Sequence, residues 1–132
     1  MTFIPQRNQV HVQRHPAAIA SLQPAPYLGL DYEASIRTGQ PTVLGLSDGT
    51  RTVSVPYEDG KPYFLELLDR FPEAQITGHN IMGYDMEVSA REGIKLRPEI
   101  AQDTILWWWL TNMNLSKAGA KTDDGEGEKR GR

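Results

Sequence analysis

Two acidic side chains that stand two positions apart, Asp31 and Glu33, are the first candidates for chemistry in this chain of 132 residues. The apolar pattern around them predicts a strand. Because side chains alternate between the two faces of a strand, both carboxylates should point one way while Leu30 and Tyr32 point the other. Carboxylates crowded on one face repel each other unless a positive charge lies between them, and hard divalent cations bind oxygen ligands. The pair therefore predicts a divalent-cation site.

Segment 78–85, Gly-His-Asn-Ile-Met-Gly-Tyr-Asp, predicts a turn that leads into a helix and delivers a third acid, Asp85. An acid at a helix N-terminus is also favoured by the helix dipole alone. That alternative leaves Asn80, in the same turn, without an explanation. The geometric prediction is that Asp31, Glu33 and Asp85 converge closely enough to share cations.

The apolar periodicity along the chain predicts a three-stranded antiparallel meander and flanking helices. Strands are expected over residues 9–14, 27–33, 42–47, 52–56 and 75–77, and helices over 16–22, 62–71, 84–92 and 104–113. Asp48 and Gly49 predict the hairpin turn within the meander, and Pro72 should end the second helix. Asp103 is interpreted as the N-cap of the last helix rather than as a further metal ligand.

The composition excludes several classes of protein. The longest strongly apolar run, residues 105–110, is far shorter than the roughly 20 residues that a membrane-spanning helix needs, so no membrane partner is expected. There is no cysteine, which suits a cytoplasmic protein without disulfides. The formal net charge is −3, with +1 in residues 117–132 and −4 in the rest, so the totals show no basic groove for nucleic acid.

The chain divides into three parts by pattern. We expect an N-terminal strand–helix lead-in and linker, a main domain and a disordered charged tail, over residues 1–26, 27–115 and 116–132. Three consecutive tryptophans, 107–109, would span about 200° of the last predicted helix, so one flat partner cannot bury all three. No later apolar element is available to cover the remaining side.

With these elements in this order, the chain resembles the DEDD 3′→5′ exonucleases, and among them the proofreading domain of family A DNA polymerases, including phage versions. Asp31 and Glu33 match the first motif of that family. Segment 78–85 matches the second motif, with a spacing one residue longer than is usual in family A. Residues 102–106 are similar to the helix start that follows the second motif, and the similarity runs over about residues 10–115.

The resemblance implies an α/β fold of the ribonuclease H-like type: a mixed sheet with an antiparallel three-stranded meander and flanking helices, here C-terminally incomplete. It also implies a two-ion Mg²⁺ or Mn²⁺ site that hydrolyses 3′-terminal nucleotides from single-stranded DNA. In that family's mechanism Asp31 would bridge both ions, Glu33 would bind the ion that activates water, and Asp85 would reach the second ion. Asn80 would bind substrate by helping to position the strand terminus.

The family's third motif, an aspartate preceded by a tyrosine or histidine on a later helix, has no match in this sequence. We therefore expect a truncated product or one piece of a longer protein, with an incomplete two-ion site and no activity alone. The expected partners are the 3′ end of single-stranded DNA and a polymerase or the missing part of the exonuclease domain.

Two other hypotheses stay open. The first is a non-catalytic module of the same fold that docks on a separately encoded polymerase or exonuclease piece through the tryptophan helix. The second is an unrelated small α/β domain whose acids are incidental. Stabilisation by Mg²⁺ or Mn²⁺ separates them, because a cation that binds only the folded state must raise its stability.

Overall fold

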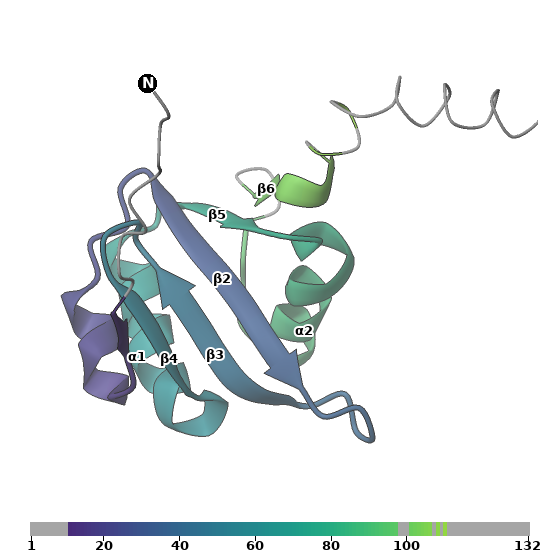
Figure 1. Cartoon of the computed structure of the whole chain (residues 1–132), viewed down its shortest axis with the longest axis horizontal. Helices are drawn as coiled ribbons and strands as arrows, with labels where there is room; N and C mark the ends of the chain where they lie inside the picture. Colours follow the sequence, from purple (N-terminus) through teal and green to yellow (C-terminus); the bar gives the residue numbers. More distant parts are fainter. Residues whose placement is uncertain (1–10, 98–100, 107, 109, 111–132) are drawn as a thin grey trace, which may run out of the picture.

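The computed structural model describes residues 11–97, 101–106, 108 and 110, which form one mixed sheet with helices on one of its faces (Figure 1). The strands are β1 (Val12–Gln13), β2 (Tyr27–Ala34), β3 (Pro41–Ser47), β4 (Thr52–Pro56), β5 (Gln75–Gly78) and β6 (Gln102–Asp103). The helical elements are the 3₁₀-helix η1 (Pro16–Ser21), α1 (Tyr57–Arg70), the π-helical turn η2 (Ile81–Asp85) and α2 (Met86–Arg91). The sheet order within the described residues is β1-β4-β3-β2-β5-β6.

The predicted meander is confirmed, with β2, β3 and β4 antiparallel to one another. The outer strands β1, β5 and β6 each run parallel to the neighbour that they join. The ladder between β2 and β5 covers only the first three residues of β2 and ends where Gly29 pairs with Thr77. From Leu30 onward, the edge of β2 on this side is therefore open to a group other than a strand.

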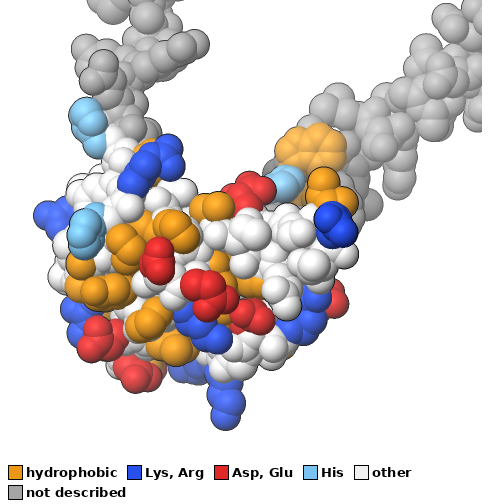
Figure 2. All heavy atoms as spheres, turned by 90° about the horizontal axis from the view of Figure 1, so that it is seen from below, with side chains coloured by type: hydrophobic (Ala, Val, Ile, Leu, Met, Phe, Trp, Pro, Cys, Tyr) orange, Lys and Arg blue, Asp and Glu red, His pale blue; other side chains and the backbone are white. Residues whose placement is uncertain are grey.

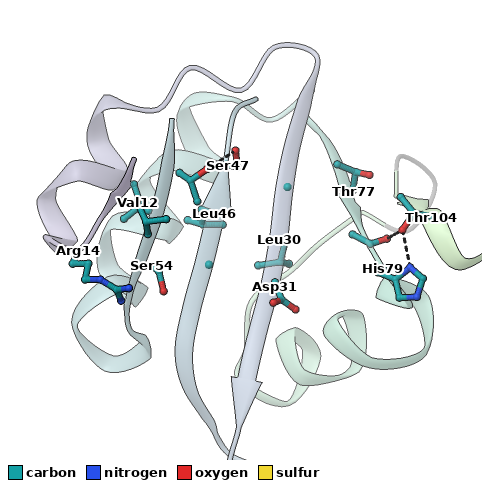
Figure 3. A pocket seen from close by; sticks show the side chains of 15 residues that line it. Val12, Arg14, Leu30, Asp31, Leu46, Ser47, Ser54, Thr77, His79 and Thr104 are labelled. Atoms are coloured by element: carbon teal, nitrogen blue, oxygen red, sulfur yellow. Dashed lines mark hydrogen bonds between the residues drawn. The ribbon is translucent and has the colours of Figure 1, made fainter. Parts of the chain in front are cut away.

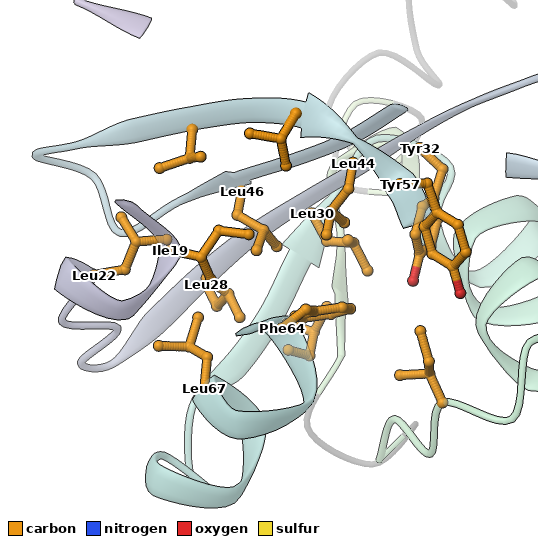
Figure 4. Close-up of a cluster of buried hydrophobic side chains, with 14 of the residues drawn as sticks. Ile19, Leu22, Leu28, Leu30, Tyr32, Leu44, Leu46, Tyr57, Phe64 and Leu67 are labelled. Carbon is orange, nitrogen blue, oxygen red and sulfur yellow. The ribbon is translucent and has the colours of Figure 1, made fainter. Parts of the chain in front are cut away.

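The hydrophobic core lies between one face of the sheet and the helices (Figure 4). In β2, Leu28, Leu30 and Tyr32 are buried while Asp31 and Glu33 are exposed, as the alternation predicts. The buried strand residues contact a core that includes Phe64 and Leu67 of α1 and Ile19 and Leu22 of the N-terminal segment. The two acids consequently lie on the sheet face opposite to the core.

The start of α1 differs from the prediction. The helix was expected from Pro62, since proline favours the first turn of a helix, but it begins at Tyr57 and holds Pro62 in its interior. Burial of the Tyr57 side chain and the acids Glu58 and Asp59 in the first turn favour the earlier start. Pro62 lacks the amide hydrogen that would bond to the carbonyl of Glu58, so this start gives up one helical hydrogen bond. The predicted stop before Pro72 is confirmed.

The predicted helix 104–113 can be followed only in part. Residues 104–106, 108 and 110 are helical, and Trp107, Trp109 and the tail 116–132 lie outside the described residues. No helix among the described residues has the length and apolar character needed to cross a membrane.

Candidate functional site

Asp85 lies against the open edge of β2, beside the residue that follows Asp31. Its Oδ1 accepts a hydrogen bond of 3.0 Å from the backbone amide of Tyr32, the residue between Asp31 and Glu33. Asp85 is only 1% exposed. Segment 78–85 is thus fixed to the strand that carries Asp31 and Glu33, at the place where the β2–β5 ladder has ended.

The carboxyl of Asp85 is electrostatically coupled to that of Asp31. Burial raises the pKa of Asp85 from 3.8 to about 6; the hydrogen bond from Tyr32 opposes this rise, and the negative charges of Asp31 and Asp103 add to it. Burial and a like charge both disfavour the ionised form of a carboxyl group. A cation held between Asp31 and Asp85 would relieve this repulsion, which is the electrostatic condition expected of a metal-binding pair.

A tight turn carries the chain from β5 to Asp85. Asn80 takes a left-handed backbone conformation with φ of 56°, which asparagine adopts more readily than most residues. Helical backbone then starts at Ile81, earlier than the predicted start at Tyr84. Gly78 passes so close to β2 that a Cβ on it would lie 2.7 Å from the carbonyl oxygen of Leu30. Only glycine allows this approach, which brings the turn to the edge of β2.

Asp103 ties this turn to β6. Its buried carboxylate accepts hydrogen bonds from the amides of Asn80 at 2.9 Å, Met82 at 3.0 Å and Ile105 at 3.0 Å. The bond from Ile105 is the local cap that the sequence predicts. The other two bonds connect segments more than twenty residues apart, and sequence reasoning missed them. A strand as short as β6 leaves no alternation pattern, so the pairing of Asp103 with Gly78 could not be read from the residues.

A second contact holds α2 against the core side of β2. The hydroxyl of Tyr32 lies 2.8 Å from Oγ of Ser89, and the Tyr32 ring packs edge-on against Tyr57 of α1 with 6.0 Å between ring centroids. Burial raises the pKa of Tyr32 to about 12, so its hydroxyl stays protonated and can donate to Ser89. Residue 32 therefore holds the α2 region twice, through its amide and its hydroxyl.

The sheet face that carries Asp31 forms an open groove of about 690 Å³ (Figure 3). Arg14 lies at the β1 side of the groove, and His79 and Thr104 lie at the β5 side, where their side chains are 3.1 Å apart. Between them the floor is low, because Gly45 lies directly opposite Asp31 in the neighbouring strand.

Charge is mixed on the surface. Figure 2 shows acidic, basic and apolar side chains side by side on the face that it presents, rather than one continuous basic patch. Arg14 is the one lysine or arginine among the residues that line the groove. Binding of a polyanion there would depend on Arg14 and on a cation at the acids rather than on a general positive field.

The predicted site residues are brought together unequally. The charge of Asp31 helps to raise the pKa of Asp85. Glu33 is exposed further along β2; it does not line the groove, and its charge is not among the causes of that raised pKa. Among the residues that the structure describes, no three His, Cys, Asp or Glu side chains are grouped so that they could hold one ion. The shared cation site of Asp31, Glu33 and Asp85 stays a prediction. Substrate binding by Asn80 also stays a prediction. The side-chain oxygen of Asn80 lies close to Gly83, 2.7 Å from where a Cβ on that glycine would be.

Comparison with known proteins places the fold. No protein-family model and no curated protein sequence matches the chain. Among solved structures, the EXO domain of Nibbler from Aedes aegypti is similar with a TM-score of 0.50 and 10% identity, over 82% of this chain and 58% of that domain. The exoribonuclease RNase D of Escherichia coli is similar with a TM-score of 0.47 and 19% identity, over 74% of this chain and 28% of that protein. The chain thus spans little more than half of the Nibbler domain, and its described residues share the fold of that domain, a ribonuclease H-like α/β arrangement.

Proposed function

We propose that this chain is a 3′–5′ exonuclease domain of a DNA polymerase I-like protein, which binds the 3′ end of single-stranded DNA in the groove beside Asp31. The observation that carries the proposal is the approach of Asp85 to the edge of β2 beside Asp31, where the negative charge of Asp31 helps to raise the pKa of Asp85. Such a pair is unfavourable without a counter-charge, so its presence beside an open groove is better explained by function than by stability.

The donor set fits Mg²⁺ or Mn²⁺. Carboxylate oxygens are the ligands that these hard cations prefer. Asp31 and Asp85 would hold one ion, and Asp31 and Glu33 the other. When bound, such ions lower the pKa of water and neutralise charge on a phosphodiester.

The chain's own groups would orient the strand. Arg14 can pair with a backbone phosphate at the far side of the groove, and His79 and Thr104 offer hydrogen bonds at the near side. The low floor at Gly45 leaves room for a sugar or base next to Asp31. Asp85 is held by Tyr32, so its carboxylate needs no reorganisation when a cation arrives.

The primary test is cation-dependent stability and binding, because the matching residues cover two of the family's three motifs. Thermal unfolding is followed with and without millimolar Mn²⁺ for the wild type, Asp31→Asn and the control Asp69→Asn. Asp69 is an exposed acid on α1, on the opposite side of the sheet. The wild type and Asp69→Asn should gain several degrees, since a ligand at 10 to 100 times its Kd stabilises the folded state by about 1.4–2.7 kcal/mol. Asp31→Asn should gain little. Equal gains in all three proteins would count against the proposal.

Nucleic-acid binding completes the test. A 3′-exposed DNA oligonucleotide, the same strand with a blocked 3′ end and an RNA of the same sequence are compared by fluorescence anisotropy in Mn²⁺ and in EDTA. The proposal predicts the tightest binding for the free DNA 3′ end in Mn²⁺. Stepwise shortening of labelled DNA that disappears in Asp31→Asn would establish hydrolysis by this chain itself.

A second candidate function is a non-catalytic module of the same fold that docks on a separately encoded polymerase or exonuclease piece. The observation that favours it is the exposure of Leu106 and Leu110, at 45% and 67%, one helical turn apart. Cation-dependent stabilisation does not separate this function from the first, because both keep the acids of the fold. The docking function predicts self-association, measured by light scattering after size exclusion, or binding of a hydrophobic dye, measured by fluorescence. Both should be lost when the two leucines are replaced by glutamine.

A further inference from the structure

We propose that Asp103 is a positioning residue of the site, which fixes the turn after β5 and so holds Asp85 where it meets Asp31. The inference rests on the proposed function in one respect, that Asp31 and Asp85 together bind a cation. It goes beyond the family resemblance, which uses Asp103 only as part of a helix start.

The carboxylate of Asp103 is committed to backbone amides and not to a ligand. Oδ1 accepts from Asn80 and Ile105, and Oδ2 accepts from Met82, all at 2.9–3.0 Å. The residue is 5% exposed. With both oxygens occupied by amides of the chain, Asp103 is poorly placed to become a metal ligand and well placed to restrain the turn.

The turn that Asp103 restrains combines two uncommon backbone conformations. Asn80 is the one non-glycine residue with positive φ in the described part of the chain, and a π-helical turn follows it directly. Such conformations persist when the surroundings over-determine them, and they occur often at functional sites. The backbone amides of Asn80 and Met82 both donate hydrogen bonds to the carboxylate of Asp103, and these two bonds supply that restraint.

The restrained turn leads directly to the site. The last residue of η2 is Asp85, whose Oδ1 receives the amide of Tyr32. If the turn relaxes, Asp85 moves relative to β2, and the amide of Tyr32 loses the partner that the structure gives it. The protection of this one amide against hydrogen exchange therefore reports the position of Asp85 with no metal and no substrate present.

A matched control exists in the same chain. Asp48, in the turn between β3 and β4, also accepts three backbone amides: those of Gln23 at 2.8 Å, Thr50 at 2.9 Å and Arg51 at 2.7 Å. Asp48 is not among the residues that line the groove. Replacement of either aspartate by asparagine removes a charge and turns an acceptor into a donor, so both variants should lose stability. Only Asp103→Asn should disturb the site.

The experiment compares the full chain, Asp103→Asn and Asp48→Asn by amide exchange and by Mn²⁺ titration. Exchange at Tyr32 is divided by exchange at Leu46, a residue of the central strand β3, to correct for the change in global stability. Asp103→Asn should raise this ratio tenfold or more and weaken Mn²⁺ binding 10- to 100-fold, the range typical for loss of a group that orients metal ligands. Asp48→Asn should leave both values within twofold of the wild type.

The outcomes separate the two proposals. An unchanged Tyr32 ratio in Asp103→Asn overturns the positioning role, whatever Mn²⁺ does. If the wild type binds no Mn²⁺ while the Tyr32 ratio rises in Asp103→Asn, the proposed function fails and the positioning role stands. If Asp103→Asn does not fold, Asp103→Glu replaces it, because this variant keeps the charge but displaces the carboxylate. Asp103→Glu must then raise the ratio of exchange at Tyr32 to exchange at Leu46. A ratio equal to that of the wild type overturns the positioning role of Asp103.

Discussion

The amide of Tyr32 donates to Oδ1 of Asp85 across 3.0 Å and joins the helix-side acid to the strand between Asp31 and Glu33. One backbone hydrogen bond thus sets the separation between two sequence motifs that lie more than fifty residues apart. Without a cation this arrangement keeps the carboxylates of Asp31 and Asp85 near each other. The free energy of unfolding should therefore depend on pH and on added metal.

The first prediction concerns pH in the absence of metal. The folded-state pKa of Asp85 is raised to about 6, above its value in the unfolded chain, so the folded state binds the proton more tightly. The contribution of Asp85 to stability is then fully present below pH 4 and is lost as the pH rises through 6. We expect the free energy of unfolding of the wild type, minus that of Asp85→Asn, to fall by about 1–3 kcal/mol over this range. Urea unfolding at several pH values in EDTA measures it, and a difference that grows with pH would contradict the geometry.

The second prediction concerns the opposite effects of removing Asp31 with and without metal. In EDTA at pH 7, Asp31→Asn should be about 0.5–1 kcal/mol more stable than the wild type, because a charge that repels Asp85 is gone. In Mn²⁺ the order should reverse, because the variant loses a cation ligand. Thermal unfolding in both buffers provides the measurement. An Asp31→Asn protein that is less stable than the wild type in EDTA would show that the two acids do not repel each other as described.

The third prediction compares two glycines in neighbouring strands. A Cβ at Gly78 would lie 2.7 Å from the carbonyl oxygen of Leu30, whereas a Cβ at Gly29 would meet nothing nearer than 3.5 Å. Gly78→Ala should therefore lose about 1–3 kcal/mol, because backbone must move to admit the methyl group. Gly29→Ala should stay within about 0.5 kcal/mol of the wild type in urea unfolding. Similar losses in both variants would mean that β5 does not approach β2 at Gly78.

The fourth prediction concerns Arg14. If this side chain pairs with one phosphate, Arg14→Ala should weaken single-strand binding for all sequences alike and reduce the slope of log affinity against log salt by about 0.7. Arg70→Ala is the control, because Arg70 is an exposed arginine at the end of α1, on the other side of the sheet. Anisotropy titrations at several salt concentrations decide it. Equal slopes in both variants would remove Arg14 from the binding site.

The meander, its hairpin turn and the outward direction of Asp31 could be predicted from the sequence, because alternation and turn residues are local signals. The alternation of Leu30, Asp31 and Tyr32 shows which face is buried without any knowledge of the partner strands. The start of α1 was not predictable in this way. Proline has a strong preference for the first helical turn, and the burial of Tyr57, which depends on tertiary contacts, helps to override it.

The links across the site could be predicted only in part. The motif in segment 78–85 indicates that Asp85 approaches Asp31, but it does not say that Asp85 is held by the amide of Tyr32. The role of Asp103 toward Asn80 depends on a two-residue strand that pairs in parallel, and such a contact leaves no periodic pattern. Non-local hydrogen bonds to backbone amides are generally invisible in a single sequence, because any residue supplies the donor.

The early end of the β2–β5 ladder has a consequence for solubility. A strand edge with unpaired amides and carbonyls is a template on which another chain can add a strand, and proteins commonly protect such edges with charge or with a covering group. Beyond Gly29, a buried carboxylate fills the place of the absent strand neighbour at Tyr32, and acids flank it on both sides. Buried Asp85 and the acids that flank Tyr32 therefore also protect this edge of β2 from pairing with a strand of another copy.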